Sequence, residues 1–102
     1  MTMRGTQYVE CRQRTLPDAE GIAIVASTRE ATFVPAEVER AGSSWRSLVL
    51  AREGHPGERI VLRPVSDDPL VIEIRFETDA ECGAIAFHLA METQGRTLDR
   101  WP

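Results

Sequence analysis

The side chains with the widest chemical repertoire in this 102-residue chain belong to two histidines, His55 and His88, and two cysteines, Cys11 and Cys82. Imidazole nitrogens and thiolates bind transition metals, and a histidine can also act as a general base. These residues are scattered along the chain and lack the clustered spacing of a zinc motif. A site built from His55, His88 and Cys82 would depend entirely on tertiary structure. The sequence therefore predicts no metal site and no other cofactor.

His88 and Cys82 both lie in the apolar stretch TDAECGAIAFHLAMETQG, residues 78–95. At about 100° per residue, His88 falls on a narrow polar stripe with Glu81 and Glu92. An exposed histidine near a carboxylate explains this placement, because no further residue completes a catalytic arrangement. Cys82 falls on an apolar face beside acidic residues, whereas a reactive thiol needs an electropositive setting. We therefore predict a packing role for Cys82 and no catalytic residue.

The same stretch carries the signals of a helix. Thr78 and Glu81 have the T-x-x-E spacing of a capping box, which satisfies free backbone N–H groups at a helix start. Gly95 suits the left-handed position that ends many helices. The spacing therefore predicts a long C-terminal helix over roughly 79–93.

The apolar residues of this helix cover two faces. Ile85 and Leu89 belong to one face, which we expect to pack on a sheet. Phe87 and Met91 belong to a second face, which is wider than a one-sided surface helix needs. We expect the TLDRWP tail at the C-terminus or a second protein molecule to cover it. A protein partner, including a second copy in a homodimer, is therefore predicted.

Tryptophan is enriched in protein interfaces, so Trp45 and Trp101 join Phe87 and Met91 as interface candidates. Both tryptophans could equally be core residues. An alternative reading places a ligand pocket between the sheet and the C-terminal helix. The polar candidates for that pocket are His88, Glu73 and Arg75.

Several runs have the alternation or β-branched composition of strands. The clearest is 70–77, where the alternation of a half-buried strand points apolar residues one way and charged residues the other. The apolar face carries Leu70, Ile72, Ile74 and Phe76, and the charged face carries Glu73, Arg75 and Glu77. It forms a predicted hairpin with 59–64, whose outer face we expect to be solvated and whose Pro64 should produce a bulge, an edge or a non-bonded pair. The register that places opposite charges together pairs Ile60 with Phe76, Leu62 with Ile74, Arg63 with Glu73 and Arg59 with Glu77. Further strands are expected at 6–13, 30–34 and 47–52.

Two short segments complete the predicted order of elements. The run GIAIVAS, 21–27, is apolar and β-branched, which favours a central strand. The run PAEVERAG, 35–42, favours a short helix, because Pro35 suits its first position, Glu37 its first turn and Gly42 its end.

The composition restricts the possible partners. The chain has 16 acidic and 12 basic residues, all of the latter arginine, for a net charge of −4. This charge argues against nucleic acid and against an anionic membrane surface. No apolar run reaches the roughly 20 residues of a membrane span, and the N-terminus lacks a signal-peptide core. We expect a cytoplasmic protein with reduced cysteines.

Together these elements predict one α+β domain over 1–102. It has a mostly antiparallel sheet of about five or six strands, a short middle helix and a long C-terminal helix packed across the sheet. This order resembles the topology of pleckstrin-homology-type domains, although the tryptophan those domains carry in the last helix is missing and Phe87 is the nearest aromatic residue. The sequence favours a non-enzymatic interaction module, such as an adaptor, inhibitor or regulatory subunit. A small dimeric enzyme or ligand-binding protein is the alternative.

Overall fold

The computed structural model describes residues 6–12, 16–27, 31–42, 44–76, 82–98 and 100–101. Among these residues the chain forms six strands and two short helices. In chain order they are β1 (Thr6–Cys11), α1 (Ala19–Ala26), β2 (Phe33–Ala41), β3 (Ser44–Arg52), β4 (His55–Asp67), β5 (Leu70–Phe76), α2 (Cys82–Glu92) and β6 (Arg96–Leu98).

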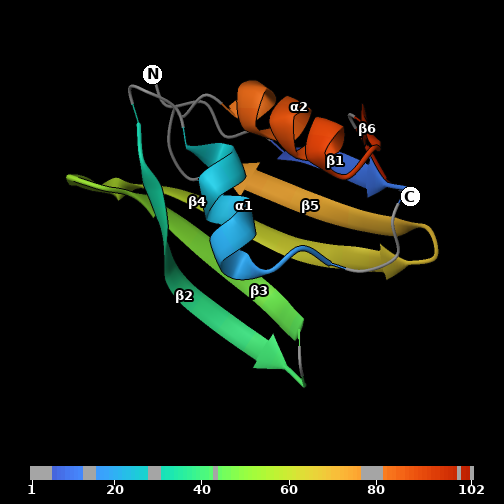
Figure 1. Ribbon diagram of the computed structural model, residues 1–102, viewed down its shortest axis with the longest axis horizontal. Helices are drawn as coiled ribbons and strands as arrows, with labels where there is room; N and C mark the ends of the chain where they lie inside the picture. Colours follow the sequence, from blue (N-terminus) through green and yellow to red (C-terminus); the bar gives the residue numbers. More distant parts are fainter. Residues whose placement is uncertain are drawn as a thin grey trace.

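All six strands form one antiparallel sheet with the order β2-β3-β4-β5-β1-β6. The N-terminal strand β1 therefore lies between β5 and the C-terminal strand β6. Both helices pack on the same face of this sheet, side by side, with α1 over the β2–β3 side and α2 over the β1–β5 side (Figure 1). The described residues thus form two layers, and neither of their helices covers the second face of the sheet.

The core lies between the two layers. Every strand from β1 to β5 contributes inward side chains to a single apolar cluster, and both helices contribute to the same cluster. Its fully buried large members include Val9, Ile22, Leu48, Leu50, Ile60, Leu62, Ile72, Ile74 and Leu89.

The predicted β4–β5 hairpin register is confirmed. Ile60 pairs with Phe76, Leu62 with Ile74 and Arg63 with Glu73. The ladder shifts by one residue between Pro64 and Ser66, which is the bulge that Pro64 was expected to produce, because proline has no N–H to donate. The remaining predicted pair, Arg59 with Glu77, lies outside the described residues.

The prediction of a central strand at 21–27 is wrong, because this segment lies in helix α1. Asp18 begins the helix, and its Oδ1 accepts a hydrogen bond of 2.7 Å from the N–H of Gly21. An apolar run of this length fits a strand or a buried helix equally well by composition. The deciding pattern was the helical spacing of the buried residues Ala19, Ile22, Ala23 and Ala26.

The prediction of a short helix at 35–42 is also wrong, because β2 occupies Phe33–Ala41. A two-turn helix has little stability of its own, whereas β2 pairs with β3 along its whole length. Pro35 is tolerated because β2 is an edge strand. Gly42, with φ of 65°, lies in the turn to β3 instead of ending a helix.

The predicted long C-terminal helix is a third correction, because α2 has only 11 residues. Gln94 takes the left-handed conformation with φ of 55°, the role that Gly95 was expected to have. Gly95 is instead in close contact with β1, where an added Cβ would lie 1.9 Å from the carbonyl oxygen of Glu10. The chain then continues as β6 beside β1, so the topology departs from a meander closed by a final helix. The predicted capping box at Thr78 and Glu81 lies outside the described residues.

Candidate interaction surface

The exposed face of α2 carries two large apolar side chains. Phe87 is 57% exposed and Met91 is 65% exposed, although Ile85 and Leu89 on the opposite side of the same helix are buried. The two exposed residues are four positions apart and therefore lie one turn apart on one face. Neither is covered by the C-terminal segment, which continues as β6 next to β1. The sequence predicted that either the C-terminal tail or a second protein molecule covers this face. The β6 segment of the tail does not cover it.

A polar strip runs beside these apolar residues. His88 and Glu92 are also exposed and also one turn apart. The rings of Phe87 and His88 meet edge to face, with centroids 6.0 Å apart. Within the described part of the chain, no ion pair or hydrogen bond fixes His88 or Glu92. Both side chains are therefore available to a partner.

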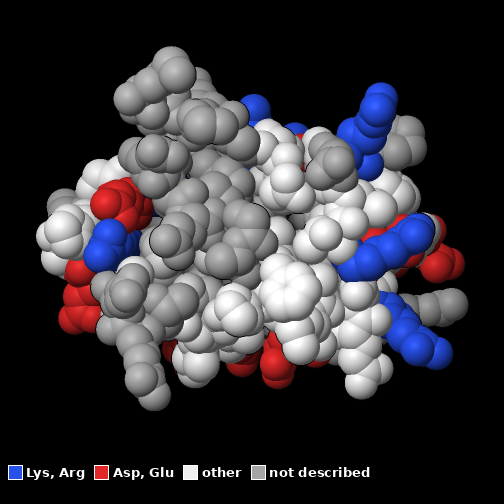
Figure 2. Space-filling view, turned by 90° about the horizontal axis from the view of Figure 1, so that it is seen from above, with Lys and Arg blue, Asp and Glu red and all other residues white. Residues whose placement is uncertain are grey.

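Helix α1 adds a third exposed apolar side chain to the same layer. Ile24 is 74% exposed, and among the described residues it, Phe87 and Met91 make up three of the four large apolar side chains with high exposure. The view onto the helix layer shows mainly uncharged atoms over its described part, with charged side chains toward the margins (Figure 2). Sequence reasoning missed Ile24, because it assigned this segment to a strand.

Neither edge of the sheet is well suited to pairing with another strand. Edge strands are blunted by proline, charge, bulges or short length. Strand β2 contains Pro35, has exposed Glu37, Glu39 and Arg40, and shows two register shifts against β3. Strand β6 at the other edge has three residues. A partner is therefore better accommodated by the helix layer than by strand addition.

The open face of the sheet holds a carboxylate with internal partners. Glu73 is 7% exposed, and its carboxylate accepts hydrogen bonds from the hydroxyl of Tyr8 at 3.2 Å and from Nε of Arg63 at 2.9 Å. Nε of Arg75 lies 3.9 Å from the same carboxylate. Burial, together with the charge and hydrogen bond of Glu73, raises the pKa of Tyr8, so the phenol remains a neutral donor. The expectation of a solvated outer face is therefore wrong at Glu73, and the sequence pattern offered no sign that Tyr8 joins it.

The three predicted pocket residues are not brought together. Glu73 and Arg75 belong to the open-face side of β5, whereas His88 is exposed on α2 in the other layer. A ligand held between the sheet and α2 would have to replace the packed side chains of Ile72, Ile85 and Leu89.

The structure places Trp45 in the core and Trp101 in a half-buried position. Trp45 is 3% exposed, and its indole N–H donates a hydrogen bond of 2.8 Å to the carbonyl oxygen of Pro17. A buried tryptophan commonly satisfies its polar group in this way. Trp45 thus ties the segment before α1 to β3 and offers no ring to a partner.

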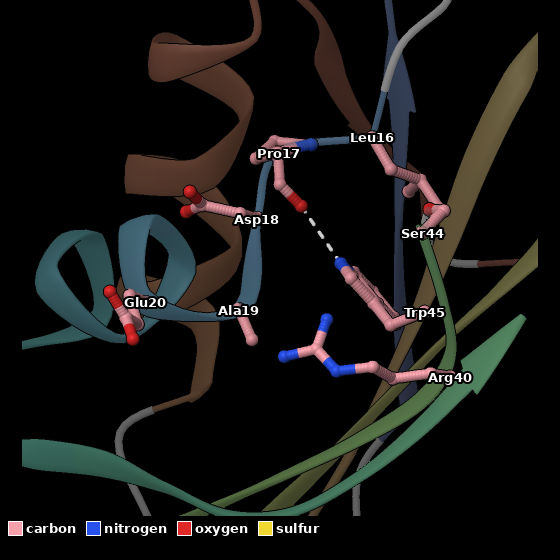
Figure 3. A pocket seen from close by; sticks show the side chains of 8 residues that line it. All are labelled: Leu16, Pro17, Asp18, Ala19, Glu20, Arg40, Ser44 and Trp45. Carbon is pink, nitrogen blue, oxygen red and sulfur yellow. Dashed lines mark hydrogen bonds between the residues drawn. The ribbon is translucent and has the colours of Figure 1, made fainter. Parts of the chain in front are cut away.

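Two cavities lie beside α1. One has a volume of about 270 Å³, and Figure 3 shows its lining side chains, among them Asp18, Glu20, Arg40 and Trp45. Asp18 is already engaged as the helix cap, and the guanidinium of Arg40 extends toward the space beside Ala19 and Trp45. The other has a volume of about 390 Å³ and lies between α1 and β2. Both differ in place from the predicted pocket under the C-terminal helix.

Metal-ligating and nucleophilic groups are not concentrated in the described ranges. There, no group of three or more His, Cys, Asp and Glu residues lies close enough to hold a metal ion. Cys11 is a free, buried thiol on β1, and burial raises its pKa despite a hydrogen bond with Thr93 that acts in the opposite direction. A raised pKa makes Cys11 a poor nucleophile. The side chain of Cys82 lies outside the described part.

Comparison of the chain with protein-family models, with curated proteins and with solved structures finds no match. Neither of the described helices is long and apolar enough to cross a membrane.

Proposed function

We propose that this protein is a small interaction module that acts by protein–protein contact through its helix layer and performs no catalysis of its own. The observation that carries this proposal is the pair Phe87 and Met91, which remains exposed on a helix whose other face is fully packed. An adaptor, an inhibitor or a regulatory subunit would each use such a surface.

The composition of the surface supports this proposal. Aromatic residues and methionine are enriched in interface cores, while charged residues are depleted there. Burying apolar surface is worth roughly 25 cal/mol per Å², and an aromatic side chain has about 150–250 Å² to bury. The exposed portions of Phe87 and Met91 are therefore sufficient to act as anchors, and His88 and Glu92 supply a polar rim.

The ligand-binding alternative has less support. The polar groups predicted for its pocket lie in different layers, and the carboxylate of Glu73 is satisfied by Tyr8 and Arg63. We also place the protein in a reducing compartment as part of this proposal, because Cys11 is a free thiol.

Site-specific photo-crosslinking tests the proposal. A benzophenone-bearing phenylalanine analogue at position 87, irradiated in a lysate of the source organism, should give discrete protein adducts. The matched control carries the analogue at Val34, which is an exposed apolar position on β2 outside the helix layer. Met91→Glu should abolish the adducts formed at position 87 without changing the unfolding transition. Absence of adducts at position 87, or equal yields at both positions, would overturn the proposal.

A further inference from the structure

We infer that the helix layer binds a second copy of the chain, with α2 of one subunit packed antiparallel on α2 of the other about a twofold axis. This inference rests on the proposed function, because it uses the same surface and names the partner. The observation behind it is that the exposed face of α2 is complementary to itself.

The four exposed residues of α2 form two strips. At about 100° per residue, residues four apart differ by roughly 40° around the helix. Phe87 and Met91 thus form an apolar strip, and His88 and Glu92 form a polar strip about 100° away from it. The buried residues Ile85 and Leu89 lie on the far side of the helix. A partner helix placed opposite the sheet would therefore touch both strips.

A twofold axis perpendicular to α2 brings unlike residues of the two strips together. Such an axis reverses the direction of the helix but keeps each strip on its own side of the interface. With the axis passing between residues 89 and 90, Phe87 of one subunit meets Met91 of the other. On the polar side, His88 meets Glu92. Each of these pairs is offset by about one residue along the helix, or about 1.5 Å, which side chains readily span.

The charges favour this arrangement over a parallel one. A parallel pair, related by a twofold axis along the helices, would exchange the two sides of the interface and place the polar strip of one subunit beside the apolar strip of the other. The antiparallel pair instead makes two contacts between an imidazole and a carboxylate. Neither group has an ion pair or hydrogen bond within the described part of its own chain, so forming these contacts breaks none there.

The area of the contact between the two α2 helices limits the expected affinity of the dimer. An 11-residue helix is about 16 Å long, and stable interfaces bury around 800 Å² per partner. The exposed face of α2 alone falls below that area. The other exposed apolar side chain of the helix layer, Ile24 on α1, lines the cavity between α1 and β2 and is not counted in this contact. We therefore expect a weak dimer with a dissociation constant of about 10–100 µM.

Sedimentation equilibrium of the purified chain measures this association directly. Between about 5 and about 500 µM, the weight-average mass should rise from that of a monomer toward that of a dimer. Phe87→Glu should weaken dimerisation at least about tenfold, because it places a carboxylate in the apolar strip. Val34→Glu, which changes an exposed apolar residue outside the helix layer, is the matched control and should leave the dissociation constant unchanged.

Two charge variants test the geometry. His88→Glu makes the polar strip wholly acidic, and Glu92→Lys makes it wholly basic, so each variant alone should dimerise more weakly than the wild type. An equal mixture of the two should regain association, because the carboxylate introduced at position 88 would then meet the ammonium group introduced at position 92 of the other variant. Circular dichroism of each variant controls for loss of the helix.

Three outcomes would overturn the inference. These are a wild-type chain that stays monomeric at about 500 µM, a mixture that associates no better than its components, and a Val34→Glu effect equal to that of Phe87→Glu. The proposed function is tested independently of the dimer. A monomeric chain that still crosslinks to another protein from position 87 would remove the second copy as partner and leave the interaction module in place.

Discussion

The two faces of the sheet bury side chains by different means. The face toward the helices is apolar and is closed by α1 and α2 (Figure 1). Neither described helix covers the other face, yet Glu73 on it is almost as inaccessible as the core residues. There the cover comes from long side chains on the same and neighbouring strands, since Arg63 and Arg75 bring their Nε atoms close to the carboxylate. Arginine stems commonly lie over a surface while the charged head stays in water.

The two faces contribute differently to the fold. Apolar burial between layers is non-directional, so the covered face supplies most of the stability. The polar network on the open face is directional and holds three strands in register, because Tyr8, Glu73 and Arg63 belong to β1, β5 and β4.

The largest effect should come from truncating the covered face. Leu62→Ala removes a fully buried side chain and should lower the free energy of unfolding by about 2–5 kcal/mol. Val61→Ala changes the preceding residue, which is half-buried on the open face, and should cost less than about 1.5 kcal/mol. Urea denaturation measures both values. If both variants lose the same free energy of unfolding, the two faces of the sheet are packed alike and the proposed difference between them is wrong.

The second effect concerns the network itself. Glu73→Ala should cost about 1–3 kcal/mol, because Tyr8 and Arg63 lose the acceptor that they share. Glu73→Gln keeps an acceptor and the shape of the side chain, so it should recover part of that loss. The exposed Glu37, which pairs with Arg59, provides the matched control, and Glu37→Gln should change the free energy of unfolding by less than about 1 kcal/mol. If Glu73→Ala lowers the free energy of unfolding no more than Glu37→Gln does, the network stabilises the fold no more than an exposed ion pair.

The third effect addresses how the covering layer is held in place. Asp18→Ala removes the N-cap of α1 and should destabilise the protein by about 1 kcal/mol. Asp18→Asn retains a capping oxygen and should restore most of the stability. Thermal unfolding followed by circular dichroism distinguishes the two variants. Identical unfolding of Asp18→Ala and the wild type would show that packing alone positions α1.

The smallest effect is a dependence on pH that differs between the faces. Cys11 on the covered face and Tyr8 on the open face both have a raised pKa, from ordinary values of 9.0 and 10.0. A raised pKa means that the folded state holds the proton more tightly, so the stabilising contribution is complete below the ordinary value and is lost as pH rises through the folded one. Stability should therefore begin to fall near pH 9 through Cys11 and fall further above pH 10 through Tyr8.

Two variants separate these contributions. Cys11→Ala should remove the first part of the decline, and Tyr8→Phe should remove the second part. Urea midpoints measured across the alkaline range provide the test. A decline that is unchanged in both variants would assign the pH dependence to other groups.

Prediction from sequence was most accurate where one local pattern admitted one structure. The alternation of Leu70, Ile72 and Ile74 with Glu73 and Arg75 permits only a strand with an inner and an outer face. Pairing opposite charges then selected the register of β4 against β5, which the structure confirms. The exposed His88 and the position of Phe87 and Met91 on a second face of α2 followed in the same way from helical spacing. That the C-terminal tail leaves Phe87 and Met91 exposed did not follow from it, because this tail was one of the two expected covers.

Prediction was least accurate for the two segments between β1 and β3. The run 21–27 is compatible with a buried strand or a buried helix, and 35–42 with a short helix or an edge strand. Tertiary contacts decided between these alternatives. Residues of β2 pair with β3 along the strand, and the small residues of α1 are buried on the sheet. The position of Trp45 depended on the same choice, since its indole bonds to Pro17 just before α1.

Local patterns were therefore enough to predict the α+β class, the two faces of the clearest strand, and the helical face that carries Phe87 and Met91. These properties follow from periodicity, which is local and is read along the chain. Tertiary contacts were needed to assign the short segments of α1 and β2, the end of α2 and the residues around Glu73. Those properties depend on contacts between residues far apart in the chain, such as Gly95 against Glu10 and Tyr8 with Glu73, and no local pattern encodes them.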